Sequence, residues 1–130
     1  MNYIRHGLKL LIAVAITCTF PFVLKASASI KEGAKVFTQK INDSFYVING
    51  GNGLGANSGV LIQDEGVLLV DSMNIHKESH EQLYDAIRKI TDKPIKYVLN
   101  THSHRDHSGG NEFFAKQGAI IITQENSDYI

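Results

Sequence analysis

The chain has 130 residues, and its 13 lysine and arginine residues balance its 13 aspartate and glutamate residues, so the formal net charge is zero. This length allows one small domain. A neutral chain offers no electrostatic attraction for nucleic acid, and no nucleic-acid partner is predicted.

The first 28 residues have the three-part pattern of a secretory signal peptide. Arg5 and Lys9 precede an uncharged apolar run over residues 10–24, and Ala26-Ser27-Ala28 offers an Ala-x-Ala cleavage site. The run is shorter than the roughly 20 residues of a membrane helix, so no stable membrane span is predicted. An uncleaved anchor is the alternative. The pattern predicts a secreted or periplasmic protein.

Residues 29–130 then form the mature chain, which we expect to be a single domain. Cleavage would remove Cys18, the only cysteine, so no disulfide is expected in an oxidising compartment. It would also remove three basic residues and no acidic residue, which leaves the mature chain mildly acidic. Its stability has to come from a modest hydrophobic core.

Strands and helices are predicted to alternate along the mature chain. β-Forming residues and turn signals predict strands over residues 34–38, 45–48, 59–63 and 67–71. The last of these is apolar on both faces, which is typical of a strand in the middle of a sheet. Asp71 ends it, and the local interpretation of Asp71 is a carboxylate that caps the following turn.

The glycine-rich segment 50–59 lies between two predicted strands. It does not complete the Gly-x-Gly-x-x-Gly pattern of a dinucleotide site, and no helical pattern follows it. We interpret it as a flexible hairpin loop.

Residues 78–91 are predicted to form a helix with one apolar stripe. The stripe consists of Leu83, Ile87 and Ile90. His76 and His80 lie four positions apart near its start, but Lys77 stands where a helical zinc-protease motif requires glutamate. Both histidines are therefore predicted to be surface residues.

The next predicted strand, residues 95–100, leads into a dense group of potential metal ligands. The segment reads Asn100-Thr101-His102-Ser103-His104-Arg105-Asp106-His107-Ser108-Gly109-Gly110-Asn111. Side chains two positions apart on an extended chain point to the same side, so His102 and His104 can close on one ion. Imidazole nitrogen and carboxylate oxygen are ligands of hydrolytic zinc sites. The alternative is a histidine-rich loop that is only solvated, or that binds metal without chemistry.

The glycine pair after these ligands lets the backbone turn sharply and approach closely. A short helix over residues 112–117 follows, capped by Asn111 or Ser108. Phe113 and Phe114 are expected to pack in the core. A last strand, residues 119–123, is expected to run parallel to the strand over residues 95–100.

The pattern His102-x-His104-x-Asp106-His107, with Thr101 before it and Gly109-Gly110-Asn111 after it, resembles the signature of the metallo-β-lactamase superfamily of hydrolases. The resemblance covers residues 45–125. It implies an α/β (α+β) fold, namely the N-terminal αβ half of a four-layer αββα sandwich. Complete members have a second, similar half that supplies the remaining metal ligands, and no histidine follows His107 here. Residues 29–130 are therefore interpreted as a truncated portion of such a domain.

This resemblance implies a zinc-dependent hydrolase of small-molecule acyl substrates, in which metal-bound hydroxide attacks an ester, thioester, lactone or β-lactam carbonyl. His102 and His104 would hold the first zinc ion. Asp106 and His107 would hold a second ion, which orients the water or stabilises the leaving group, so Asp106 is the predicted catalytic residue. For Asp71 the resemblance adds a second interpretation, a hydrogen bond that supports a metal-binding histidine.

Two alternatives stay open beside the zinc hydrolase. One is a non-catalytic metal-binding fragment. The other is an iron-dependent persulfide oxygenase of the same superfamily, which can share this ligand pattern. The sequence does not specify the substrate or the oligomeric state.

Overall fold

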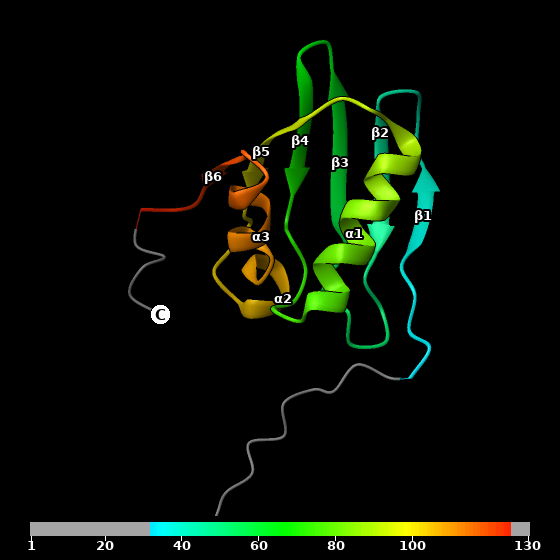
Figure 1. Cartoon of the computed structure of the whole chain (residues 1–130), viewed down its shortest axis with the longest axis vertical. Coiled ribbons are helices and arrows are strands. Elements are labelled where there is room, and N and C mark those ends of the chain that lie inside the picture. Colours follow the sequence, from blue (N-terminus) through cyan, green and yellow to red (C-terminus); the bar gives the residue numbers. More distant parts are fainter. Residues whose placement is uncertain (1–31, 126–130) are drawn as a thin grey trace, which may run out of the picture.

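The computed structural model describes residues 32–125 as a six-stranded sheet with its helices on one face (Figure 1). The predicted signal peptide, including Cys18 and the Ala26-Ser27-Ala28 cleavage site, lies outside the described residues. Among residues 32–125, no helix is long and apolar enough to cross a membrane.

The sheet is mixed, and its strands lie side by side in the order in which they occur in the chain. The first four strands pair antiparallel, and the last two run parallel to their neighbours, as predicted for the last strand. The α/β class is confirmed. The strands are β1 (Phe37–Lys40), β2 (Phe45–Asn49), β3 (Ser58–Gln63), β4 (Gly66–Val70), β5 (Ile95–Leu99) and β6 (Ile120–Ile122). The helices are α1 (Lys77–Ile90), α2 (Arg105–Ser108) and α3 (Asn111–Lys116).

The hydrophobic core lies between the sheet and the helices α1 and α3. Leu83 and Ile87, from the predicted stripe of α1, are fully buried in one cluster with Leu69 of β4. Burying a side chain of this size contributes about 1.5–3 kcal/mol. Phe114 of α3 is also fully buried, and Phe113 packs at the edge of the same cluster. The predicted placement of both phenylalanines in the core is confirmed.

The other face of the sheet carries apolar side chains, and neither α1 nor α3 packs on it. The strand register aligns these positions in two rows across five strands. The rows are Phe45–Leu61–Leu68–Tyr97–Ile120 and Val47–Gly59–Val70–Leu99–Ile122. The rows are most open at β5 and β6, where Ile120 is 59% exposed and Tyr97 is 41% exposed. We call these ten positions the open sheet face.

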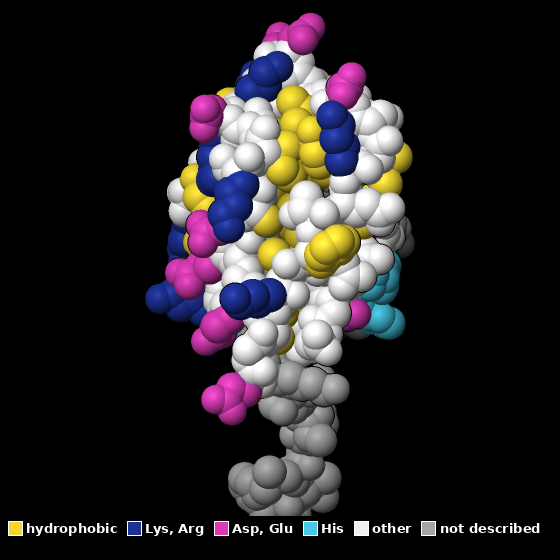
Figure 2. All heavy atoms as spheres, turned by 90° about the vertical axis from the view of Figure 1, so that its right-hand side faces the viewer, with side chains coloured by type: hydrophobic (Ala, Val, Ile, Leu, Met, Phe, Trp, Pro, Cys, Tyr) yellow, Lys and Arg dark blue, Asp and Glu magenta, His cyan; other side chains and the backbone are white. Residues whose placement is uncertain are grey.

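The edge of the sheet at β1 is a short strand whose side chains are all exposed. Figure 2, which views the molecule from this side, shows hydrophobic side chains in the middle and charged side chains around them. Lys40 and Asp43 form an ion pair of 2.8 Å at the end of this edge. A short edge strand flanked by charges is poorly suited to pairing with another sheet.

Candidate metal centre

The predicted ligands lie where the parallel strands β4 and β5 end. Parallel neighbours bring their carboxyl ends to the same edge of a sheet, a common place for ligand sites in α/β folds. Asp71 follows β4, and its backbone N–H donates to the Leu99 carbonyl of β5 at 2.9 Å. The motif segment starts one residue beyond β5, so Asp71 and the histidines share one edge.

Asp71 is buried and connects the end of β4 to the motif segment. Its carboxylate accepts hydrogen bonds from the Thr101 backbone N–H and from the Thr101 hydroxyl, each at 2.8 Å. The same carboxylate lies 2.8 Å from Nδ1 of His107. An ionised carboxylate can only accept, so this contact selects the His107 tautomer with its proton on Nδ1 and a free lone pair on Nε2. The described hydrogen-bond partners of the Asp71 carboxylate are thus Thr101 and His107. None of them belongs to the turn at Ser72 and Met73.

Three imidazole rings gather around the first turn of the motif segment. The centroids of the His102 and His107 rings are 3.9 Å apart, and those of His102 and His104 are 4.7 Å apart. The Thr101 hydroxyl oxygen lies 3.1 Å from Nδ1 of His102. The predicted approach of His102 to His104 is therefore present, and the His107 ring also lies close to that of His102.

Helix α2 is a feature that the sequence analysis missed. It places Asp106 and His107 on one short turn, so that an Asp106 carboxylate oxygen lies 3.6 Å from Nε2 of His107. His104 precedes the helix with an extended backbone, and its carbonyl accepts from the His107 backbone N–H at 2.9 Å. A turn of four residues is too short to leave a helical periodicity in the sequence.

The donor types of this cluster fit a zinc ion, since neutral imidazole and carboxylate are its usual nitrogen and oxygen ligands. The rings approach one another in pairs. Within residues 32–125, however, no three or more histidine, cysteine or acidic side chains are arranged as a group that could hold a metal. The described chain therefore supplies suitable donors without a complete set.

A polar network that the sequence analysis also missed lies behind the cluster. The Ser72 hydroxyl lies 2.8 Å from Oδ1 of Asn111, whose amide donates to Oδ1 of Asn100 at 2.6 Å. The Asn100 amide in turn donates to the His107 carbonyl at 3.3 Å. The prediction that Asn111 or Ser108 caps the last helix is wrong, because the cap residue is Gly110 and the Asn111 side chain serves this network. The one feature of the sequence that could have indicated this network is the pair of asparagines, Asn100 and Asn111, that flank the motif.

The glycine pair is required because the backbone of residues 72–75 passes directly against it. A Cβ on Gly109 would lie 2.2 Å from the backbone nitrogen of Ile75, and one on Gly110 would lie 2.3 Å from the Ser72 carbonyl oxygen. Both distances are far below van der Waals contact. These glycines thus hold the motif segment against the segment that links β4 to α1.

His80 was predicted to be a surface residue, and the structure places it half-buried. Its Nδ1 is buried without a hydrogen-bond partner, and its ring stacks on Phe113 with centroids 4.7 Å apart. Burial lowers the pKa of His80 below its ordinary value, and a backbone interaction with Asn74 opposes this in part. Burial between α1 and α3 thus disfavours the charged form of the His80 ring.

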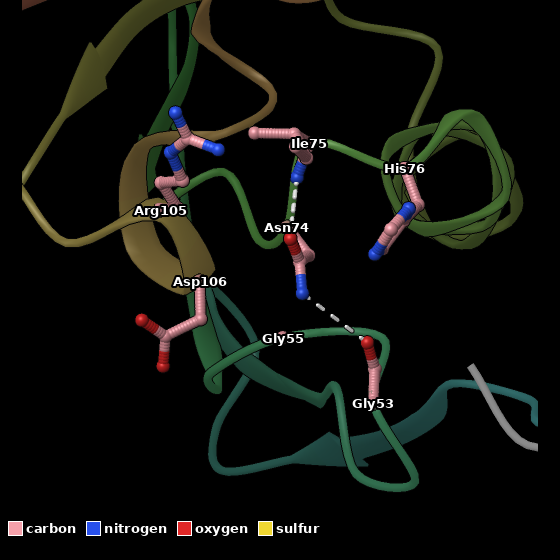
Figure 3. A pocket seen from close by; sticks show the side chains of 7 residues that line it. All are labelled: Gly53, Gly55, Asn74, Ile75, His76, Arg105 and Asp106. Atoms are coloured by element: carbon pink, nitrogen blue, oxygen red, sulfur yellow. Dashed lines mark hydrogen bonds between the residues drawn. The ribbon is translucent and has the colours of Figure 1, made fainter. Parts of the chain in front are cut away.

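The glycine-rich segment forms the loop of the β2–β3 hairpin, as predicted, and it is anchored beside the motif. Leu54 is fully buried, and the Ala56 backbone N–H donates to the Asp106 carbonyl at 2.9 Å. Between this loop and α2 lies an open pocket of about 460 Å³ (Figure 3). Its lining consists of Gly53, Gly55, Asn74, Ile75, His76, Arg105 and Asp106.

A mixed sheet with histidines and a carboxylate just beyond the ends of its parallel strands is the arrangement expected of an α/β protein with a ligand site at that edge. The comparison with known families makes this specific. Residues 51–123 match the model of the metallo-beta-lactamase superfamily, and the chain belongs to that superfamily.

Curated relatives agree with this assignment. The chain is 30% identical over 105 residues to the metallo-beta-lactamase type 2 of Elizabethkingia meningoseptica, a match that covers 77% of this chain and 42% of the relative. It is 33% identical over 98 residues to metallo-beta-lactamase IND-1 of Chryseobacterium indologenes, covering 72% of this chain and 40% of the relative. The matched region thus spans less than half the length of these relatives.

Solved structures show the same fold. The metallo-beta-lactamase FIM-1 from Pseudomonas aeruginosa, described in a mono-zinc form, superimposes with a TM-score of 0.60 at 20% identity. The superposition covers 72% of this chain and 44% of that chain. The predicted relationship to the N-terminal αβ half of this fold is confirmed.

Proposed function

We propose that this chain carries the metal-binding half of a zinc-dependent hydrolase acting on small acyl substrates. The bond cleaved would be that of an ester, thioester, lactone or β-lactam carbonyl. His102 and His104 would hold one zinc ion, and Asp106 and His107 a second. The single observation that carries this proposal is the buried Asp71 carboxylate, which lies 2.8 Å from Nδ1 of His107.

That contact matters because a histidine that binds a metal through one ring nitrogen commonly donates its other N–H to a carboxylate. Asp71 thereby orients the His107 ring and leaves Nε2 available, while the Thr101 hydrogen bonds hold Asp71 itself in place. A histidine on a solvated loop is hydrogen-bonded by water, so a buried carboxylate in contact with its ring is not expected there. The Asp71 contact therefore favours a metal site over a solvated loop.

The roles of the remaining residues follow from their exposure and neighbours. Zinc bound at this edge would act as a Lewis acid and lower the pKa of water. Asp106 is exposed and lies at the rim of the pocket, where its carboxylate can accept a proton from water or bind the second ion. The pocket beside α2 would receive the substrate.

Zinc titration of the metal-free full chain by calorimetry tests the proposal. Substituting alanine for His102 or for His104 should weaken zinc binding about tenfold or more, because each removes a direct ligand. His76→Ala is the matched control, since it removes a histidine outside the motif and should leave zinc affinity unchanged. Zinc affinity that is the same in all three variants would contradict the assignment.

Hydrolysis is measured in parallel with a β-lactam, a thioester and a lactone, each with and without a chelator. A metal-binding role without turnover is the second candidate. It is favoured by the lack of a complete donor set within residues 32–125. Bound zinc without any chelator-sensitive hydrolysis would support that candidate, and bound iron in protein from the native host would support the persulfide oxygenase.

We also infer export of the protein through residues 1–28. The intact mass of the protein purified from its native host tests this. A mass that lacks these residues supports cleavage after Ala28, and a mass that retains them supports the uncleaved anchor.

A further inference from the structure

Several donors converge on the backbone carbonyl of His107. The Ser72 backbone N–H donates to it at 2.6 Å, the Ser72 hydroxyl lies 3.2 Å from it, and the Asn100 side-chain amide donates to it at 3.3 Å. A carbonyl oxygen has two lone pairs, so Ser72 and Asn100 fill its accepting capacity. The main chain at His107 is thus held by the residue that follows Asp71 and by the residue that follows β5.

Asn111 links the same residues into a closed circuit of hydrogen bonds. Its side-chain amide donates to Oδ1 of Asn100 at 2.6 Å, and its Oδ1 lies 2.8 Å from the Ser72 hydroxyl. Because the His107 carbonyl can only accept, it fixes the orientation of the Asn100 amide, which in turn fixes that of Asn111. Ser72 is fully buried and Asn100 is 7% exposed, so these hydrogen bonds lie in a region of low dielectric, where they strengthen one another.

The backbone on either side of Ser72 has an unfavourable conformation. Asp71 has a φ of 61° and Met73 a φ of 63°, in the left-handed region that residues with a Cβ rarely adopt. Such residues persist where their surroundings hold them, and they concentrate at functional sites. With this backbone, the Asp71 carboxylate meets the His107 ring and the Ser72 N–H meets the His107 carbonyl. One strained turn therefore contacts both the side chain and the main chain of His107.

We propose that Ser72, Asn100 and Asn111 are positioning residues for His107. They fix its main chain so that its imidazole stays against the Asp71 carboxylate with the proton on Nδ1. The placement of the ring is a property of the metal-free chain, whereas its consequence for zinc rests on the proposed function. If the circuit only satisfied buried polar groups, its loss would lower stability without any change at the His107 ring.

Histidine NMR of the isotope-labelled, metal-free full chain tests this, at a pH above the ordinary histidine pKa of about 6.5. In the parent chain the His107 ring should carry its proton on Nδ1, and this proton should exchange slowly with water because Asp71 accepts it. Asn111→Leu keeps the size of the side chain but opens the circuit, so the other tautomer should become populated. Exchange of the Nδ1 proton should become roughly fivefold faster, as expected for losing a hydrogen bond that holds the ring in place.

Two further variants make the result specific. Ser72→Ala opens the circuit at another point with a smaller change, so it should act in the same direction, and it decides alone if Asn111→Leu does not fold. Because the circuit acts as one unit, the double variant should exchange no more than about twofold faster than Asn111→Leu. Ile87→Val is the matched control, since it removes a methyl group from the core and belongs to no part of the circuit. It should lower the resistance to urea and leave the His107 tautomer and exchange rate unchanged.

A parent ring with its proton on Nε2, or a ring that neither Asn111→Leu nor Ser72→Ala disturbs, would overturn the inference. Calorimetric zinc titration separates it from the proposed function. Asn111→Leu should weaken zinc binding about tenfold, the low end of the effect of a group that supports a ligand. A disturbed ring in a chain that never binds zinc supports the positioning role and refutes the hydrolase. Weakened zinc binding with an undisturbed ring refutes the positioning role alone.

Discussion

The carboxylate of Asp71 and the imidazole of His107 lie 2.8 Å apart, although 36 positions separate them in the sequence. The contact exists because β4 and β5 are parallel neighbours, which places the residue after β4 beside the segment after β5. Helix α1 links β4 to β5 and so allows the two strands to run parallel. This connection brings the Asp71 carboxylate beside the His107 imidazole.

The Asp71–His107 pair predicts the effect of an amide at position 71. Asp71→Asn keeps the size of the side chain but replaces one acceptor oxygen by a donor, so it favours the His107 tautomer with its proton on Nε2. Zinc affinity measured by calorimetry should fall about 10- to 100-fold, the usual effect of losing such a partner. Asp85→Asn, an exposed change on α1, should have no effect. Unchanged zinc binding in Asp71→Asn would show that the pair is only structural.

The lowered pKa of the half-buried His80 predicts a loss of stability in acid. Burial lowers the pKa of His80 in the folded protein, so the unfolded chain takes up the proton more readily. The stabilisation from the neutral ring is complete above the ordinary histidine pKa of about 6.5 and is lost progressively as the pH falls below it. Urea unfolding at pH 7.5 and at pH 5.5 measures this. The pH dependence should be smaller in His80→Phe, which keeps a ring against Phe113, and an identical dependence in both proteins would contradict the prediction.

The close approach at Gly109 predicts a severe steric effect. Gly109→Ala places a Cβ 2.2 Å from the Ile75 backbone nitrogen, and it should cost about 3 kcal/mol or more, since backbone cannot move aside like a flexible side chain. Gly118→Ala is the matched comparison. Gly118 has a φ of 94° and open space around it, so alanine there should cost only about 1–2 kcal/mol of backbone strain. Thermal unfolding of both variants gives the comparison, and equal losses would contradict the steric explanation.

The open sheet face predicts self-association. Apolar surface that is not covered tends to pair with other apolar surface. Ile120 is 59% exposed on this face. Ile120→Lys should therefore reduce self-association, seen as a lower sedimentation coefficient in a sedimentation-velocity experiment. Ile41→Lys makes the same chemical change at a position that is 51% exposed and lies outside the two rows. If Ile41→Lys reduces association as strongly as Ile120→Lys, the open sheet face is not the contact.

Local pattern in the sequence was sufficient for most of the fold. The stripe of Leu83, Ile87 and Ile90 predicted α1 within one residue at each end, since a long helix repeats its apolar spacing several times. The buried strand β4 was recognised by its apolar character on both faces. The first strand, expected at residues 34–38, lies instead at Phe37–Lys40, where every side chain is exposed and no alternation marks the strand.

The candidate site was likewise predictable only in part. The ligand-rich motif is continuous in the sequence, so its residues could be found directly. The supporting contacts join distant segments, as in the pair of Ser72 with Asn111 or the approach of Ile75 to Gly109, and they depend on the packing of α1 and α3. The half-buried position of His80 depends likewise on stacking with Phe113, which no local pattern in the sequence indicates.

The order of the strands has a consequence for how this layer is made. Each strand from β2 to β6 is bonded to the strand that precedes it in the chain, so no pairing has to wait for a later segment to be inserted between earlier ones. As the chain is extruded from the ribosome or the translocon, the sheet can grow by one strand at a time from its amino-terminal edge. Asp71 emerges 36 positions before His107, and the Thr101 hydrogen bonds that hold its carboxylate can form only once β5 has joined the sheet, just before the last histidine of the motif arrives.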